Sequence, residues 1–410
     1  MKSLVAFVSL LLVGCAAIWA QNAGRNSGNR AGTGGIPEGT HNAVAPRTSA
    51  GSNPAINAAV EKGARWLASV QGSDGGWGQD GGDPANVRQG DSLESTGNDV
   101  ANTALAALAL LRAGDKYRAS VERAVDFVLR RVEASPMDGL SITDARQTDA
   151  RQTQIQRKLG PYIDTFVASM LLAQVDGTFA KAGNVRIRSG LEKCVAKIQR
   201  NQLKDGSWNV AGGWAPLLGT SLASRSLYDA EKKGLAVDRD VMARADAFTV
   251  KNQKDRDSMA GVGAGSGRGS GGVSADGRSI GAVSETVAVT SAAGVALYQD
   301  AQALEQLSRT PESRRKNAKE IDAINGKLSS SRFVEGYGSI GGEEFFSYLN
   351  ISDGLKRSGG KAWNEWHSKI TDKILKLQNN DGTWAGHHCI TGRCAVTSAA
   401  ILNLTSDRAN

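Results

Sequence analysis

Apolar residues recur at three- and four-residue spacing along most of the chain. In residues 56–70 (INAAVEKGARWLASV), the side chains of Ile56, Val60 and Leu67 fall on one face, which predicts an amphipathic helix. The next segment of this kind, residues 98–111 (NDVANTALAALALL), is almost entirely Ala and Leu. A helix that is apolar on most of its faces is typically buried. The chain therefore begins its folded part with a mixed helix followed by a buried one.

This alternation of a mixed and a buried helix occurs six times, at intervals of about 60 residues, which indicates a repeat architecture. The predicted pairs, mixed helix first, are 56–70 with 98–111, 120–132 with 162–175, 186–199 with 220–228, 240–250 with 287–298, 314–328 with 345–355, and 361–377 with 395–404. No strand-type alternation of any length interrupts them. The buried helices are rich in Ala, Ser and Thr, which lets them approach closely around a central axis. We therefore expect an all-α protein with two concentric helix layers closed into a ring, which avoids the end caps of an open array.

One heptapeptide, Gln-x-x-Asp-Gly-x-Trp, follows the first, third and sixth mixed helices as QGSDGGW, QLKDGSW and QNNDGTW. Its defining residues are Gln71, Asp74, Trp77, Gln202, Asp205, Trp208, Gln378, Asp381 and Trp384. Asp-Gly favours a tight turn, because Gly accepts positive φ and Asp bonds its own backbone. The motif therefore stands where a helix must satisfy its last carbonyl groups and turn.

These motifs resemble the QW motif shared by squalene–hopene cyclases, protein prenyltransferase β subunits and complement-type thioester domains. The resemblance implies an (α/α)6 toroid of six helix pairs, terpenoid cyclase/prenyltransferase-like, over residues 55–405. It also implies that the Gln and Trp residues of the motif tie neighbouring outer helices together. Because one fold hosts many functions, the likeness predicts architecture more strongly than activity.

The chemical markers of those families are missing from the sequence. There is no Asp-rich DxDD acid, no CGEQ thioester sequence, and no zinc-binding Asp-x-Cys with a distant His; Glu192-Lys193-Cys194 is the nearest match. Aromatic residues make up only 5% of the chain, which counts against carbocation stabilisation. We therefore expect a binding or scaffold toroid for a lipid or isoprenoid, a glycan or a protein. The alternative is a terpenoid cyclase/prenyltransferase-like enzyme with a non-standard site in the central cavity.

The first residues predict export from the cytoplasm. Met1-Lys2 and a short apolar run form a signal peptide over residues 1–20. Two processing routes remain open: cleavage at a lipobox in residues 12–15 (LVGC), which would leave Cys15 acylated, or cleavage after Ala20. Residues 21–54 are rich in Gly, Asn, Ser and Ala and predict a flexible low-complexity linker. We expect a periplasmic or cell-envelope lipoprotein, or a secreted protein, that meets a membrane only through an N-terminal lipid anchor.

The charge of the chain does not change this expectation. Its 49 basic and 41 acidic residues give a formal net charge of +8, with the basic residues spread along the sequence. A diffuse excess of this kind favours solubility or contact with anionic surfaces. Because no nucleic-acid-binding motif accompanies it, no nucleic-acid partner is predicted.

Candidate site residues lie just before the buried helices, whose N-termini should gather on one rim of the cavity. The sequence HHCITGRC contains His387, His388, Cys389 and Cys394. A disulfide between Cys389 and Cys394 with both His residues at the surface is favoured over a zinc site, because export permits disulfides and adjacent residues aim poorly at one ion. Cys194, at an apolar helical position, is expected to be a buried free thiol. No cofactor is predicted, and zinc at His387, His388 and Cys389 is the alternative.

Acidic residues on the same rim have two interpretations. Asp99 and Asp164 are candidate general acids if an apolar cavity raises their pKa values, but helix capping is favoured. Glu343 and Glu344 precede the fifth buried helix. The Gly-rich segment 261–281 lacks a phosphate-binding motif and predicts a mobile loop, and the acidic segment 79–99 predicts a solvated loop without calcium-binding spacing.

Overall fold

The computed structural model describes residues 53–80, 97–142, 154–208, 216–263, 294–334 and 341–408. They belong to the unit Ser52–Asn410, and the other unit of the chain, Met1–Gly51, lies outside the described residues. The signal peptide, Cys15 and nearly all of the linker therefore stay predictions, as do most of the acidic loop and residues 264–281 of the Gly-rich segment.

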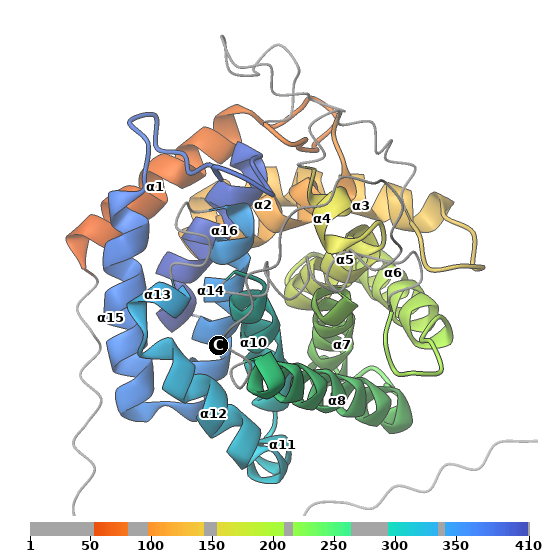
Figure 1. Cartoon of the computed structure of the whole chain (residues 1–410). Coiled ribbons are helices and arrows are strands. Elements are labelled where there is room, and N and C mark those ends of the chain that lie inside the picture. Colours follow the sequence, from red (N-terminus) through yellow and green to blue (C-terminus); the bar gives the residue numbers. More distant parts are fainter. Residues whose placement is uncertain are drawn as a thin grey trace, which may run out of the picture. The chain divides into compact units, whose positions relative to one another are not determined.

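Helices form two sets that alternate along the chain (Figure 1). The outer set is α1 (Pro54–Ser69), α3 (Arg118–Ala134), α6 (Lys181–Arg200), α8 (Arg239–Gly263), α11 (Pro311–Lys316) continued by α12 (Ala318–Leu328), and α15 (Gly360–Lys376). The inner set is α2 (Val100–Ala113), α5 (Ile163–Val175), α7 (Pro216–Lys232), α10 (Gly294–Leu307), α14 (Gly342–Ser358) and α16 (Arg393–Leu404). The short helices α4 (Ile155–Leu159) and α13 (Ser331–Val334) precede α5 and α14.

The inner helices close into a ring. Each contacts the next in the order α2, α5, α7, α10, α14, α16, and α16 contacts α2 again. Each outer helix packs against inner helices, so two concentric layers result (Figure 1). The predicted all-α toroid of six helix pairs is confirmed. Within the described residues the only strand-type pairing is the isolated bridge between Trp77 and Asp99.

Burial follows the division into two layers. Every residue of α16 is buried, including its run of small residues from Thr397 to Ala400, whereas α3 buries one face and exposes the other. Small side chains allow the inner helices to pack closely at the centre. Although the inner helices are apolar, no helix among the described residues is long and apolar enough to cross a membrane.

The three Trp residues of the repeated motif are fully or almost fully buried and fasten an outer helix to the next inner helix. Their indole Nε1 groups donate to backbone carbonyls ten residues earlier, and their backbone amides donate to a Thr hydroxyl of the next inner helix. The indole bonds join Trp77 to Leu67 (2.8 Å), Trp208 to Ile198 (2.7 Å) and Trp384 to Ile374 (2.8 Å). The Thr partners are Thr103, Thr220 and Thr397.

The three Gln residues link neighbouring outer helices, as the resemblance implies. Each side-chain amide donates to a carbonyl in its own turn and to a carbonyl in the following outer helix. The carbonyls in the following helix belong to Ser120 in α3 (2.9 Å from Gln71), Val241 in α8 (2.8 Å from Gln202) and Ala59 in α1 (2.9 Å from Gln378). The last of these bonds joins the sixth outer helix to the first and so closes the outer layer.

The fourth inner helix differs from its prediction. It was expected to span 287–298, but α10 continues to Leu307, while 287–293 lie outside the described residues. Its second half contains Asp300, Gln302 and Glu305, which broke the apolar pattern of the sequence. These polar side chains are nevertheless buried, because they pair with other polar groups inside the ring. Glu305, for example, forms ion pairs with Arg309 and Arg357.

Candidate functional site

A small cavity lies between the inner helices. The space open to water-sized molecules inside it is about 70 Å³. Most of its wall is aliphatic, and the only aromatic lining residue among those described is Phe346. The apolar lining consists of Leu105, Leu108, Ile155, Leu159, Ile163, Val167, Met170, Leu218, Leu222, Phe346, Leu349 and Leu402. All are drawn from α2, α4, α5, α7, α14 and α16, so this is the central cavity that the toroid predicts.

Charged side chains occupy one end of the cavity wall. Arg112, Arg225, Asp229 and Asp353 line it there, and Arg225 Nη2 lies 2.5 Å from Asp353 Oδ2. Burial raises the pKa of Asp229, although Arg225 opposes the shift. The cavity therefore combines a long apolar wall with a polar end that offers both hydrogen-bond donors and acceptors.

Behind that polar end lies a buried ion cluster around Glu305. Its carboxylate pairs with Arg309 and accepts from Arg357 Nη2 at 3.0 Å. Burial opposes ionisation of this carboxyl group, but the guanidinium groups of Arg309, Arg357 and Arg225 lower the pKa of Glu305 to about 2. A buried charge needs such partners, and the cluster thus links α10 with α14 and the chain that follows α10.

At the opposite end, the predicted acids form a closed network. Asp99 caps α2 by accepting the Asn102 amide at 2.9 Å, as the favoured interpretation proposed. Gln156 Nε2 then donates to Asp99 Oδ1 at 2.9 Å and to Asp164 Oδ1 at 3.0 Å. Burial raises the pKa of Asp99. Neither Asp lines the cavity, whereas Ile155 beside Gln156 does, so α4 covers this end and keeps the two acids out of it.

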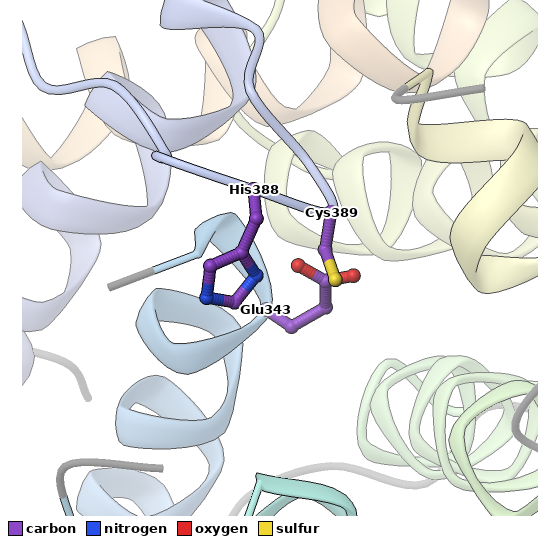
Figure 2. A group of neighbouring side chains, drawn as sticks. All are labelled: Glu343, His388 and Cys389. Atoms are coloured by element: carbon purple, nitrogen blue, oxygen red, sulfur yellow. The ribbon is translucent and has the colours of Figure 1, made fainter. Parts of the chain in front are cut away.

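A second group on the same rim joins α14 to the loop before α16. The potential ligand atoms of Glu343, His388 and Cys389 all lie within 4.8 Å of one another (Figure 2). Glu343 stands in the first turn of α14 and is 2% exposed, while His388 and Cys389 are partly exposed. Burial, reinforced by the Glu343 carboxylate, raises the pKa of the Cys389 thiol to about 12. Cys389 has φ 60°, the only positive φ of a non-glycine residue in the part of the chain described.

The disulfide predicted between Cys389 and Cys394 is not formed in the structure, where both are free cysteines. The reason is that the two side chains contact different residues. Cys394 is buried at the start of α16 with Sγ 3.8 Å from the Asn102 carbonyl, whereas Cys389 faces Glu343. His387 is exposed and is not part of the rim group. Cys194 is buried and free, as expected.

Sequence reasoning missed the charged end of the cavity and the partnership of Glu343 with the loop before α16. The sequence places Glu343 just before a buried helix, and no local motif connects it to His388. Asp229 and Arg225 stand near the end of an inner helix, three and four residues from Ser226 and Ser221. A charged residue inside an otherwise small and apolar helix was the available signal, because such residues are rarely buried without a partner.

The fold and these groups place the protein in the class of closed rings of helix pairs with an apolar central cavity. Residues 22–140 match the family model "Squalene-hopene cyclase C-terminal domain", so the likeness to the terpenoid cyclase and prenyltransferase family is confirmed in that part of the chain. Two solved structures of a type II terpene cyclase from Scytonema, one in complex with merosterolic acid A and one with geranylgeranyl dihydroxybenzoate, are also similar. Each is 12% identical with a TM-score of 0.32, over 86% of this chain and 97% of the other. No curated protein matches.

Proposed function

We propose that this protein is an exported toroid that binds the apolar chain of a lipid or isoprenoid in its central cavity and holds the polar head of that ligand at Arg112, Arg225 and Asp229. The observation that carries the proposal is the cavity itself, apolar over most of its wall and charged at one end. A ligand with one apolar and one polar part would match both. The predicted signal peptide supports a place of action in the cell envelope or outside the cell.

The volume of the cavity favours a slender chain over a bulky ring system. Its open space of about 70 Å³ has room for a few water-sized molecules or one stretch of a slender chain. Binding sites of this kind are mostly aliphatic or aromatic, with a small number of polar groups that fix orientation. The side chains at the polar end would provide that orientation through hydrogen bonds to a hydroxyl, carboxyl or phosphate group.

Mass spectrometry of small molecules that co-purify with the mature protein tests this proposal. We expect a lipid or isoprenoid in stoichiometric amount, and its loss in Leu222→Trp, which fills the cavity. Leu203→Trp, at a side chain that is 37% exposed, is the matched control and should retain the ligand. A correctly folded wild-type protein that carries no such ligand, and binds neither palmitate nor farnesol on titration, would refute the proposal.

One observation favours a catalytic alternative, in which a carboxylic acid in the cavity protonates a polyprenyl substrate. Asp229 has a raised pKa and lines the cavity, as such an acid must. Against this role stands the cavity wall, where Phe346 is the single aromatic residue described and would alone have to stabilise cationic charge. In the same mass spectra, cyclised products that disappear in Asp229→Asn would support the enzyme, and an unchanged linear ligand would support the binding protein.

A further inference from the structure

We propose that Glu343, His388 and Cys389 form a zinc site on the rim of the toroid, which fastens the loop before α16 to the first turn of α14. Figure 2 shows the three side chains close together. Their carboxylate, imidazole and thiol donor atoms lie within 4.8 Å of one another. None of the three lines the central cavity. The proposal is therefore independent of what the cavity binds.

The backbone around the three residues is already organised to bring them together. The Gly342 amide donates to the Ile390 carbonyl at 3.0 Å, and the Ile390 amide donates to Glu343 Oε2 at 3.0 Å. Both bonds are made by Ile390, the residue that follows Cys389, and they hold the loop against α14. A metal site needs such a supporting frame, because its ligands must be positioned before the ion arrives.

Gly341, the N-cap of α14, and Gly342, its first residue, permit this approach. A Cβ atom on Gly342 would lie 2.2 Å from the Ile390 carbonyl oxygen, and one on Gly341 would lie 2.6 Å from the His388 ring. Another residue at Gly342 would push the loop backbone away from α14, and one at Gly341 would displace the His388 ring. Positive φ at Cys389, which costs a residue with a Cβ about 1 kcal/mol or more, completes the placement of the thiol.

The donor set selects zinc over other common cations. Thiolate and imidazole suit zinc, whereas magnesium and calcium prefer oxygen ligands throughout. Zinc bonds of about 2.0–2.3 Å in tetrahedral geometry place donor atoms roughly 3.3–3.8 Å apart, so the donor atoms need to approach one another by at most about 1.5 Å on binding. The partly exposed His388 and Cys389 side chains have room for this adjustment, and the three ligands leave a fourth position for water or for Glu344.

Charge also favours a cation at this point. Glu343 and Glu344 are adjacent and almost fully buried, at 2% and 0% exposure. His388 Nε2 lies 4.0 Å from Glu344 Oε1, and the positive charge of Lys158 interacts electrostatically with Glu343. Buried carboxylates are normally paired with cations or bind metals. A divalent ion between Glu343 and Cys389 would add positive charge beside both groups and stabilise the thiolate.

Zinc analysis of the purified, reduced mature protein tests the site. After removal of metal by a chelator and titration with zinc, we expect one ion per chain. His388→Ala and Cys389→Ser should each weaken zinc binding by about 100-fold or more, since each removes a ligand. Cobalt should bind in place of zinc and give a sulfur-to-metal charge-transfer band that is absent in Cys389→Ser.

The neighbouring His387 provides a matched control, because it is exposed and lies outside the group. His387→Ala should bind zinc as the wild type does and show the same cobalt band. Thermal unfolding of the metal-free variants establishes that each is folded. The proposal fails if the wild type binds no zinc, if His387→Ala loses as much affinity as His388→Ala, or if Cys389 of the exported protein is found in a disulfide with Cys394.

Discussion

The bond from Gln378 to Ala59 gives a direct test of ring closure. Gln378→Ala removes two hydrogen bonds, of 2.9 Å to the Ala59 carbonyl and 2.9 Å to the Gly382 carbonyl. Each such bond contributes about 1 kcal/mol net, so the variant should lower the free energy of unfolding by about 2 kcal/mol. Gln202→Ala is the internal standard, since Gln202 makes the equivalent bonds to Gly206 and Val241 at 3.1 and 2.8 Å.

Denaturant unfolding and amide hydrogen exchange together provide the assay. If the ring is closed, the two variants should lose stability equally. Exchange should accelerate in α1 and α15 for Gln378→Ala and in α6 and α8 for Gln202→Ala, because only the elements at the broken joint are loosened. A cost below about 0.5 kcal/mol for Gln378→Ala, beside a cost of about 2 kcal/mol for Gln202→Ala, would mean that α1 and α15 are not joined as described.

Two further predictions concern the turn of the motif and the ion cluster behind the cavity. Gly206→Ala should destabilise the protein by more than Gly234→Ala: both glycines have positive φ (92° and 77°), but a Cβ on Gly206 would lie 2.2 Å from the Arg244 carbonyl oxygen and one on Gly234 meets nothing within 4 Å. Equal losses of melting temperature in the two variants would contradict this. Glu305 has a pKa of about 2 when folded, below its ordinary 4.5, so its stabilisation of about 3 kcal/mol is present above pH 4.5 and is lost as the pH falls toward 2. Glu305→Gln should be less stable at pH 7 and should show a flatter melting temperature between pH 5 and pH 2; parallel pH profiles for variant and wild type would refute this role.

Much of the fold could be predicted from the sequence because its determinants are local. A helix of Ala and Leu such as 98–111 shows its burial in its own composition, and the motif QNNDGTW contains both the turn and the Gln that reaches the next helix. The second half of α10 could not be predicted in this way. Its burial depends on the ion pairs that Glu305 forms with Arg309 and Arg357, and Arg357 lies on another helix 52 residues away. Side-chain pairing over such separations leaves no periodic signal in the sequence.

The placement of charge follows from the direction of the inner helices. Helix N-termini favour anions and C-termini favour cations, and when inner helices share one direction these preferences add at each end of the ring. Asp99 and Glu343 accordingly stand at helix N-termini, and Arg112 and Arg357 in the last turns. Asp99 and Glu343 therefore share one rim, where the loop before α16 adds an imidazole and a thiol. Neither HHCITGRC nor GGEE indicates a metal by itself, because the donor set arises only when ring closure brings the two sequences together.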